Sequence, residues 1–191
     1  MLKLIDVTKK FGELVAVNDL SFDVEAGQIF GIAGPNGAGK STVYNLITGF
    51  YPFEGRIEFE GRNIAGRQPY QIAKLGIART FQIPQTFPSL TVAQSVGVGN
   101  RFGARGRFDP AYVDEVLDFM ELTPVRHALT GQLSLLDKKR LMMGAALATK
   151  PKILMLDEPM AGSNTNEIKA LMKSIRRINQ EMGVTIIIIE H

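Results

Sequence analysis

Cysteine is absent from the 191 residues of this chain. That absence excludes disulfide-stapled scaffolds, zinc sites built from thiolates and cysteine nucleophiles, and it suits a reducing compartment. With 45% apolar and 21% charged residues, the composition matches ordinary globular proteins, which excludes a disordered tail or a collagen-like chain. A chain of this length is expected to form one domain.

Long hydrophobic runs are also missing. The aliphatic stretches at 153–156 and 186–189 are four residues each, whereas a helix needs about 20 apolar residues to cross a bilayer. Charged residues, among them Lys3, Asp6 and Lys9, interrupt any secretory signal in the first ten residues. We therefore expect a soluble, cytoplasmic domain.

Neither sign of charge dominates. The 22 lysines and arginines exceed the 19 acidic residues by three. So small an excess permits an anionic ligand or a membrane-surface partner but does not indicate nucleic acid.

The hydrophobic pattern predicts strands that alternate with helices, which indicates an α/β fold with a mostly parallel sheet covered on both faces. Residues 2–24 alternate as strands do, and the apolar run 28–33 predicts a buried strand. The strand signal fades between residues 84 and 131, which indicates a small helical subdomain. Further strands are expected at 56–59, 77–81, 153–156 and 184–189, and helices at 40–48, at 69–74, after Asp109-Pro110, after Ser134 and from Asn164 to Gly183.

A glycine-rich segment lies between a predicted strand and a predicted helix. Residues 34–41 fit the phosphate-loop pattern G-x-x-x-x-G-K-[ST]. Glycines let backbone N–H groups wrap phosphate oxygens, and the helix that follows points its positive end at the anion. Lys40 would reach the β- and γ-phosphates, Ser41 would bind Mg²⁺, and Thr42 would reach an α-phosphate oxygen. The candidate nucleotide-binding residues are Gly34, Pro35, Asn36, Gly37, Ala38, Gly39, Lys40, Ser41 and Thr42.

Asp157 and Glu158 follow a predicted buried strand. A carboxylate at the end of such a strand commonly holds Mg²⁺, directly or through water, so Asp157 is a candidate metal ligand. Glu158 is better placed to polarise a water for attack on the γ-phosphorus.

Several motifs in this order resemble the nucleotide-binding subunit of ABC transporters, across nearly the whole chain. Residues 153–159 (ILMLDEP) match the Walker B strand and its glutamate, and residues 161–164 (AGSN) lie where the family has its D-loop. The segments GPNGAGKST, ARTFQ and ALATKP are most similar to importer ATPases for branched-chain and related amino acids.

The resemblance implies roles for three further residues. Gln82 would sense the γ-phosphate or ligate Mg²⁺, and His191 would hold the γ-phosphate and order Glu158. Phe11 would stack on adenine, although an aromatic after a strand also suits a core. The catalytic candidates are thus Glu158, His191, Gln82 and Lys40, and the metal candidates are Ser41, Gln82 and Asp157.

The fold implied is a P-loop NTPase core with an N-terminal antiparallel β-subdomain and a small helical subdomain. Residues 1–83 and 146–191 would form the core and residues 84–145 the helical subdomain, without the C-terminal part of the usual domain.

The function implied is ATP hydrolysis, with Mg²⁺, that energises an importer. The partners would be a second ATP-binding subunit and membrane-spanning permease subunits at the inner face of the cell membrane. No nucleic acid is expected. Ile83, Phe87 and Leu90 could contact the permease, and core packing explains them equally well.

The signature segment departs from the family. Residues 133–137 read Leu-Ser-Leu-Leu-Asp in place of Leu-Ser-Gly-Gly-Gln. Ser134 could still contact the ATP of the other subunit, or it could cap the next helix with Asp137 as a capping box. The basic residues 138–140 could offset the charge of Asp137, and a solvated helix face explains them better.

Two alternative functions stay open. The altered signature suggests a nucleotide-binding module that does not hydrolyse ATP. The loop 101–109, in which Arg101, Arg105 and Arg107 interleave with Phe102 and Phe108, suggests a soluble ATPase that acts on nucleic acid or ribosomes.

Overall fold

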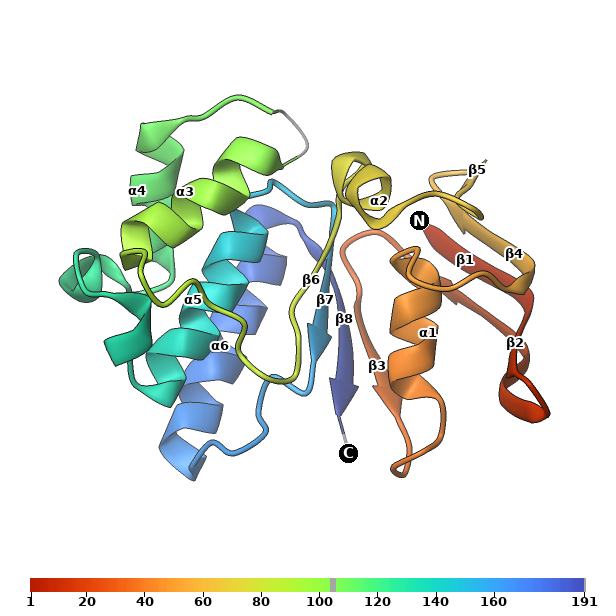
Figure 1. The fold of residues 1–191 in the computed structure, drawn as a ribbon. Helices are drawn as coiled ribbons and strands as arrows, with labels where there is room; N and C mark the ends of the chain where they lie inside the picture. Colours follow the sequence, from red (N-terminus) through yellow and green to blue (C-terminus); the bar gives the residue numbers. More distant parts are fainter. Residues whose placement is uncertain (104–105, 191) are drawn as a thin grey trace.

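A computed structural model describes residues 1–103 and 106–190 of the chain. Within those residues the strands form two four-stranded sheets, and helices flank the second of them (Figure 1). No helix in the described residues is long and apolar enough to span a membrane.

Sheet A is antiparallel and contains the N-terminal residues. Its order is β2-β1-β4-β5, and β1 pairs with β2 from Leu2 opposite Val24 to Phe11 opposite Leu14. The alternating residues 2–24 thus form a hairpin, which confirms the expected antiparallel β-subdomain. Its strands are β1 (Leu2–Phe11), β2 (Leu14–Val24), β4 (Glu54–Phe59) and β5 (Arg62–Asn63).

Sheet B is parallel, with the order β3-β8-β7-β6. The strands β7 and β8 lie in its centre and are buried on both faces, as their runs of isoleucine and leucine predict. Its strands are β3 (Ile29–Ala33), β6 (Ile77–Arg79), β7 (Ile153–Asp157) and β8 (Thr185–Glu190).

The prediction that residues 28–33 form a buried strand was wrong about burial. The strand exists as β3, but Ile29, Gly31 and Ala33 are exposed. In the described part of the chain β3 is one of the two edge strands of sheet B, and it pairs only with β8. An apolar run identifies a strand, but its neighbours decide its burial.

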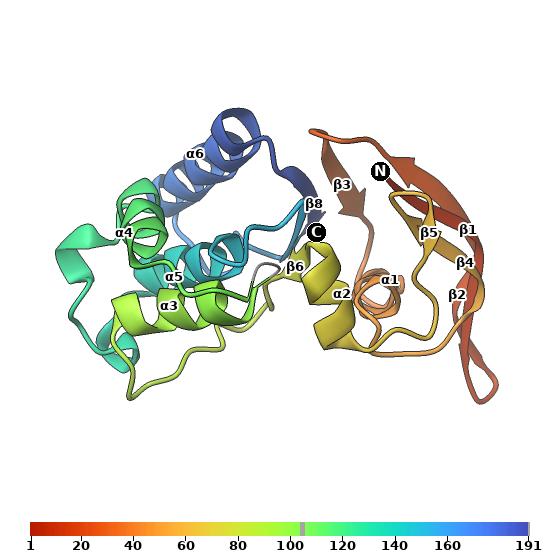
Figure 2. The same cartoon turned by 90° about the horizontal axis from the view of Figure 1, so that it is seen from above.

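Two hydrophobic cores cover the two faces of sheet B. Ile153, Met155 and Ile187 pack with α1, α2 and sheet A, whereas Leu154 and Leu156 pack with α3, α4, α5 and α6. Figure 2 shows the same division, with α1 between the two sheets and α3 to α6 across sheet B. The helices are α1 (Lys40–Ile47), α2 (Pro69–Leu75), α3 (Val92–Phe102), α4 (Pro110–Phe119), α5 (Leu135–Leu147) and α6 (Thr165–Met182), with short 3-10 turns at Thr123–Val125 and Thr130–Gln132.

Local signals predicted most helix ends. Asp109 caps α4 by accepting from the Tyr112 N–H, and Asn164 forms a capping box with Glu167 at the start of α6, which ends at Gly183. The helix α3 was not predicted individually. It lies within residues 84–131, for which the sequence predicts a helical subdomain. The predicted strand 77–81 is shorter than expected, because β6 ends at Arg79. The subdomain boundaries at 83/84 and 145/146 stay a prediction.

Candidate nucleotide-binding and catalytic site

The phosphate loop joins β3 to α1, as the motif requires. Gly39 directly precedes α1 with a φ of 86°, in the left-handed region that favours glycine. A Cβ at Gly39 would lie 2.3 Å from the carbonyl oxygen of Ala16 on β2. Gly39 is therefore required both by its backbone conformation and by close approach to sheet A.

Lys40, Ser41 and Thr42 form the first turn of α1. The Lys40 ammonium is buried and donates to the carbonyl oxygen of Pro35 at 3.0 Å and to that of Gly34. Ser41 is exposed at the mouth of the loop. A buried cation and an exposed hydroxyl at a helix N-terminus are the groups that bind a phosphate chain and its metal ion.

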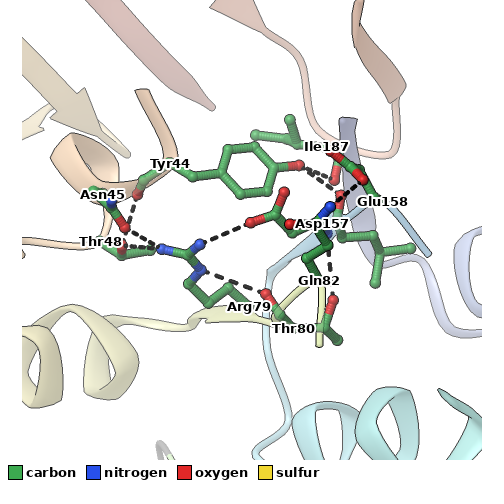
Figure 3. Close-up of polar contacts among 10 residues, drawn as sticks. Tyr44, Asn45, Thr48, Arg79, Thr80, Gln82, Asp157, Glu158 and Ile187 are labelled. Atoms are coloured by element: carbon green, nitrogen blue, oxygen red, sulfur yellow. Dashed lines mark hydrogen bonds and ion pairs between the residues drawn. The ribbon is translucent and has the colours of Figure 1, made fainter. Parts of the chain in front are cut away.

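Glu158 and Gln82 meet although they are 76 positions apart in sequence. The Gln82 side-chain amide donates to Glu158 Oε2 at 2.5 Å (Figure 3). Glu158 follows β7, is buried, and has a φ of 46°, an uncommon conformation for a residue other than glycine. Its backbone N–H donates to the Ile189 carbonyl at 3.0 Å, which stabilises that turn against β8.

A cleft of about 390 Å³ brings most of the predicted residues together. It runs from Phe11 along the phosphate loop to Gln82 and Glu158. Phe11 is 42% exposed and contacts Tyr51 edge-on, with ring centroids 5.3 Å apart, so it is not a core residue. The lining residues are Phe11, Leu14, Ala16, Asn36, Gly37, Ala38, Gly39, Lys40, Ser41, Thr42, Gln82 and Glu158.

Asp157 is buried beside this cleft and forms an ion pair with Arg79. The Arg79 guanidinium donates to Asp157 Oδ2 at 3.0 Å, and both side chains are almost inaccessible to solvent. Burial raises the pKa of the Asp157 carboxyl, and the Arg79 charge opposes that shift. Burial disfavours the charged form of Arg79 as well, and this lowers the pKa of its guanidinium. Asp157 carries the oxygen donors that Mg²⁺ prefers.

Comparisons with known proteins agree with this arrangement. The ABC transporter family model matches residues 17–161. The chain belongs to the ABC transporter family. It is 35% identical to the high-affinity branched-chain amino acid transport ATP-binding protein BraF of Pseudomonas aeruginosa, with 100% of this chain and 82% of the relative covered. The corresponding protein LivG of Escherichia coli is 34% identical, with the same shares covered.

Solved cassettes of the family share the fold. An ATP-binding cassette in its ADP conformation matches with a TM-score of 0.88 and 32% identity, over 100% of this chain and 80% of that one. A dimeric cassette in a post-hydrolysis state, bound to ADP and Pi, matches with a TM-score of 0.87 and 27% identity, over 100% and 88%. This chain therefore has the fold of an ABC ATPase.

The signature segment of this cassette lies away from the cleft. Ser134 is exposed at the N-terminus of α5, where its hydroxyl accepts from the Asp137 N–H at 3.1 Å and donates to the Asp137 carboxylate at 2.7 Å. Ser134 thus caps the helix as expected, but the Asp137 carboxylate bonds to the Ser134 hydroxyl and not to its backbone. Leu135 is exposed, whereas Leu136 packs against the helical core.

Two of the three basic residues that follow, Lys139 and Arg140, are not on a solvated face. Lys139 is 4% exposed, and its ammonium donates to the Ala161 carbonyl and, at 2.8 Å, to the Ser163 hydroxyl in the D-loop. Arg140 forms an ion pair with Glu121. The favoured interpretation was wrong for these two residues, because the D-loop and α4 pack against α5 on this side.

Two predicted residues, His191 and Arg105, lie outside the described residues. For the permease contact, Ile83 is 70% exposed and Phe87 55% exposed, which excludes core packing for both, whereas Leu90 is half-buried.

Arg79 was missed by sequence reasoning. A single charge at the end of an apolar strand was the available signal, because a buried charge needs a partner. Its partner could not be named from the sequence, since Asp157 lies 78 positions away.

Proposed function

We propose that this chain is the ATP-hydrolysing subunit of an importer for branched-chain or related amino acids. The observation that supports it best is the cleft, where the phosphate loop faces Gln82 and Glu158. The names of the relatives, which are branched-chain amino acid transport ATP-binding proteins, support the substrate class.

The polar and aromatic groups of the cleft would have separate tasks in hydrolysis. The loop N–H groups and Lys40 would bind the β- and γ-phosphates, and the ring of Phe11 would stack on adenine. Glu158 would accept the proton of the attacking water, and the amide of Gln82 keeps Glu158 turned into the cleft. His191 is proposed to contact the γ-phosphate.

Mg²⁺ fits the oxygen donors in and beside the cleft. Ser41, Gln82 and Asp157 would hold the ion, directly or through water, and all three offer the hard oxygen ligands that it prefers. When bound, Mg²⁺ neutralises charge that develops on the phosphates. The protein contributes by fixing these donors on β7, on α1 and in the segment after β6.

The complete site requires a second subunit. Ser134 is exposed and does not line the cleft of its own chain. In a head-to-tail pair, its hydroxyl and the N-terminus of α5 would reach the γ-phosphate bound by the partner. The dimeric post-hydrolysis cassette supports such a pair.

A groove on the helical segment is the proposed contact with the permease at the inner face of the membrane. It has a volume of about 720 Å³, lies between α3 and α4, and is lined mainly by apolar side chains. Leu90 lies at one end, and the exposed Ile83 and Phe87 precede α3 in sequence. An apolar groove with exposed aromatic residues nearby is typical of a protein contact.

Glu158→Gln tests the hydrolytic function. The amide oxygen can still accept from Gln82, so nucleotide affinity should be unchanged, while phosphate release should fall by about 10²–10⁴-fold because the base is lost. The measurement is steady-state phosphate release with transporter partners present, alongside binding of a fluorescent ATP analogue. Glu25→Gln, in an exposed turn, is the matched control and should hydrolyse like the wild type.

One observation favours a module that binds ATP without hydrolysing it. Leu135 places a side chain where the family has a glycine, on the helix end that would approach the partner's phosphate. If the wild-type chain with its partners binds ATP but releases no phosphate, this alternative replaces the hydrolytic function.

A further inference from the structure

Arg79 is a buried charge enclosed by aromatic rings. It ends β6, and its guanidinium lies 4.7 Å from the ring centroid of Phe81 and 5.5 Å from that of Tyr44. A guanidinium stays charged in proteins. Burial of such a charge is costly unless its donors are paired. Its partners therefore show which parts of the molecule it joins.

Besides the carbonyl oxygen of the adjacent Thr80, which accepts from Nε at 3.4 Å, the partners of Arg79 come from two parts of the nucleotide site. One terminal nitrogen donates to Asp157 Oδ2 at 3.0 Å, at the end of β7. The other donates to Asn45 Oδ1 at 2.7 Å, in the last turn of α1, and to Thr48 Oγ1 at 3.4 Å, directly after that helix. Figure 3 shows the guanidinium between these groups. The planar fork joins a carboxylate on the sheet to the helix that begins at Lys40.

This connection has consequences for the metal donors. Ser41 lies in the first turn of the same helix, and Asp157 is on the other side of the fork. Arg79 bonds to Oδ2 of Asp157, which fixes the orientation of the carboxylate and leaves Oδ1 outside this ion pair. A group that orients a metal ligand in this way commonly changes metal affinity by about 10–100-fold.

We propose that Arg79 is a positioning residue that fixes the Asp157 carboxylate relative to the phosphate-loop helix and so sets the Mg²⁺ requirement of the site. The inference rests on the proposed function, since it assigns Mg²⁺ to Asp157 and Ser41. It adds a residue that does not line the cleft and acts through Asp157.

The test compares Arg79→Met with Asn45→Ala. Arg79→Met removes the charge and the fork. Asn45→Ala removes the 2.7 Å contact to α1 but keeps the Arg79–Asp157 ion pair and the longer contact to Thr48. We expect the half-maximal Mg²⁺ concentration for hydrolysis to rise about tenfold or more in Arg79→Met and severalfold in Asn45→Ala. In EDTA, the affinity for a fluorescent ATP analogue should be unchanged in both variants. When binding of the analogue is measured as a function of Mg²⁺ concentration, the half-maximal Mg²⁺ concentration should rise by the same factors as for hydrolysis. Arg79→Lys, which keeps the charge without the fork, should lie between Arg79→Met and the wild type and serves if Arg79→Met does not fold.

Arg177→Met is the matched control. Arg177 lies over the Phe119 ring, donates to the Phe119 carbonyl and pairs with Glu181, but it is on α6. Arg177→Met should lower the melting temperature of the protein without changing its Mg²⁺ requirement. If the variants at Arg79 and Asn45 also lose only thermal stability, the positioning role is overturned. If the wild type itself hydrolyses no ATP at any Mg²⁺ concentration, it is the proposed function that fails.

Discussion

At the scale of single residues, the site depends on how each buried charge is compensated. Lys40 loses water on folding and replaces it with the carbonyl oxygens of Gly34 and Pro35. These oxygens belong to the loop that would wrap the phosphates, so the ammonium is fixed where the charge is needed. Asp157 is compensated by a cation, Arg79, from a neighbouring strand. Lys40 is thus paired with neutral oxygens and Asp157 with a cation. Substitutions at these two positions should therefore have different effects.

Lys40→Ala should weaken nucleotide binding strongly. The variant removes a charge-assisted contact worth about 1.5–3 kcal/mol, which corresponds to a 10- to 150-fold loss of affinity. Equilibrium binding of a fluorescent ATP analogue measures it. Lys10→Ala removes the same charge from an exposed position on β1 and should bind normally. Equal affinities for Lys40→Ala and Lys10→Ala would show that the phosphate site is elsewhere.

At the scale of elements, α5 is joined to the D-loop by one buried lysine. The ammonium of Lys139 bonds to Ala161 and Ser163, between β7 and α6. Burial lowers the pKa of Lys139. The signature helix and the segment after Glu158 are thus connected, so we expect a substitution in one to affect the other.

Lys139→Met should destabilise this unit. The substitution leaves a carbonyl and a hydroxyl without their donor, at a cost of about 1–3 kcal/mol, and should lower the melting temperature by several degrees, since about 1 kcal/mol corresponds to 2–4 °C at this size. Differential scanning calorimetry measures the shift. The half-exposed neighbour Lys138 provides the control, because Lys138→Met removes an equal charge. The same decrease in both variants would argue against the D-loop contact.

At the scale of the whole molecule, the described chain holds a phosphate loop and a signature helix that do not face one another. Ser134 is exposed at the N-terminus of α5, and the cleft is bounded by β1, β2, the phosphate loop, α1 and the residues after β6 and β7. A head-to-tail pair would complete each site with residues of both chains. Assembly should therefore depend on nucleotide.

Glu158→Gln with ATP and Mg²⁺ should form more dimer than the wild type. Loss of turnover preserves ATP in the interface, and removal of a carboxylate near the γ-phosphate relieves repulsion between like charges. Size-exclusion chromatography with light scattering measures the dimer, and adding Lys40→Ala to the same chain should abolish it. If the chain stays monomeric under all these conditions, Glu158 keeps its proposed role as the base, but the head-to-tail pair is rejected.

The sequence alone was sufficient wherever the signal is local. The phosphate loop, the caps at Asp109 and Asn164 and the end of α6 at Gly183 depend on residues within a few positions, because backbone conformation and capping act over three or four residues. The strands β7 and β8 were predicted for the same reason, since short uninterrupted apolar runs are typical of central parallel strands.

Tertiary structure decided which elements became neighbours, and with it the burial of each charge. Strand order left β3 at the edge of sheet B, although its sequence resembles that of a buried strand. The pairs Arg79–Asp157 and Gln82–Glu158 join residues more than 70 positions apart, and Lys139 is buried where α5 meets the D-loop. Burial and ion pairing depend on which surfaces meet in space, and neither composition nor periodicity along one segment contains that information.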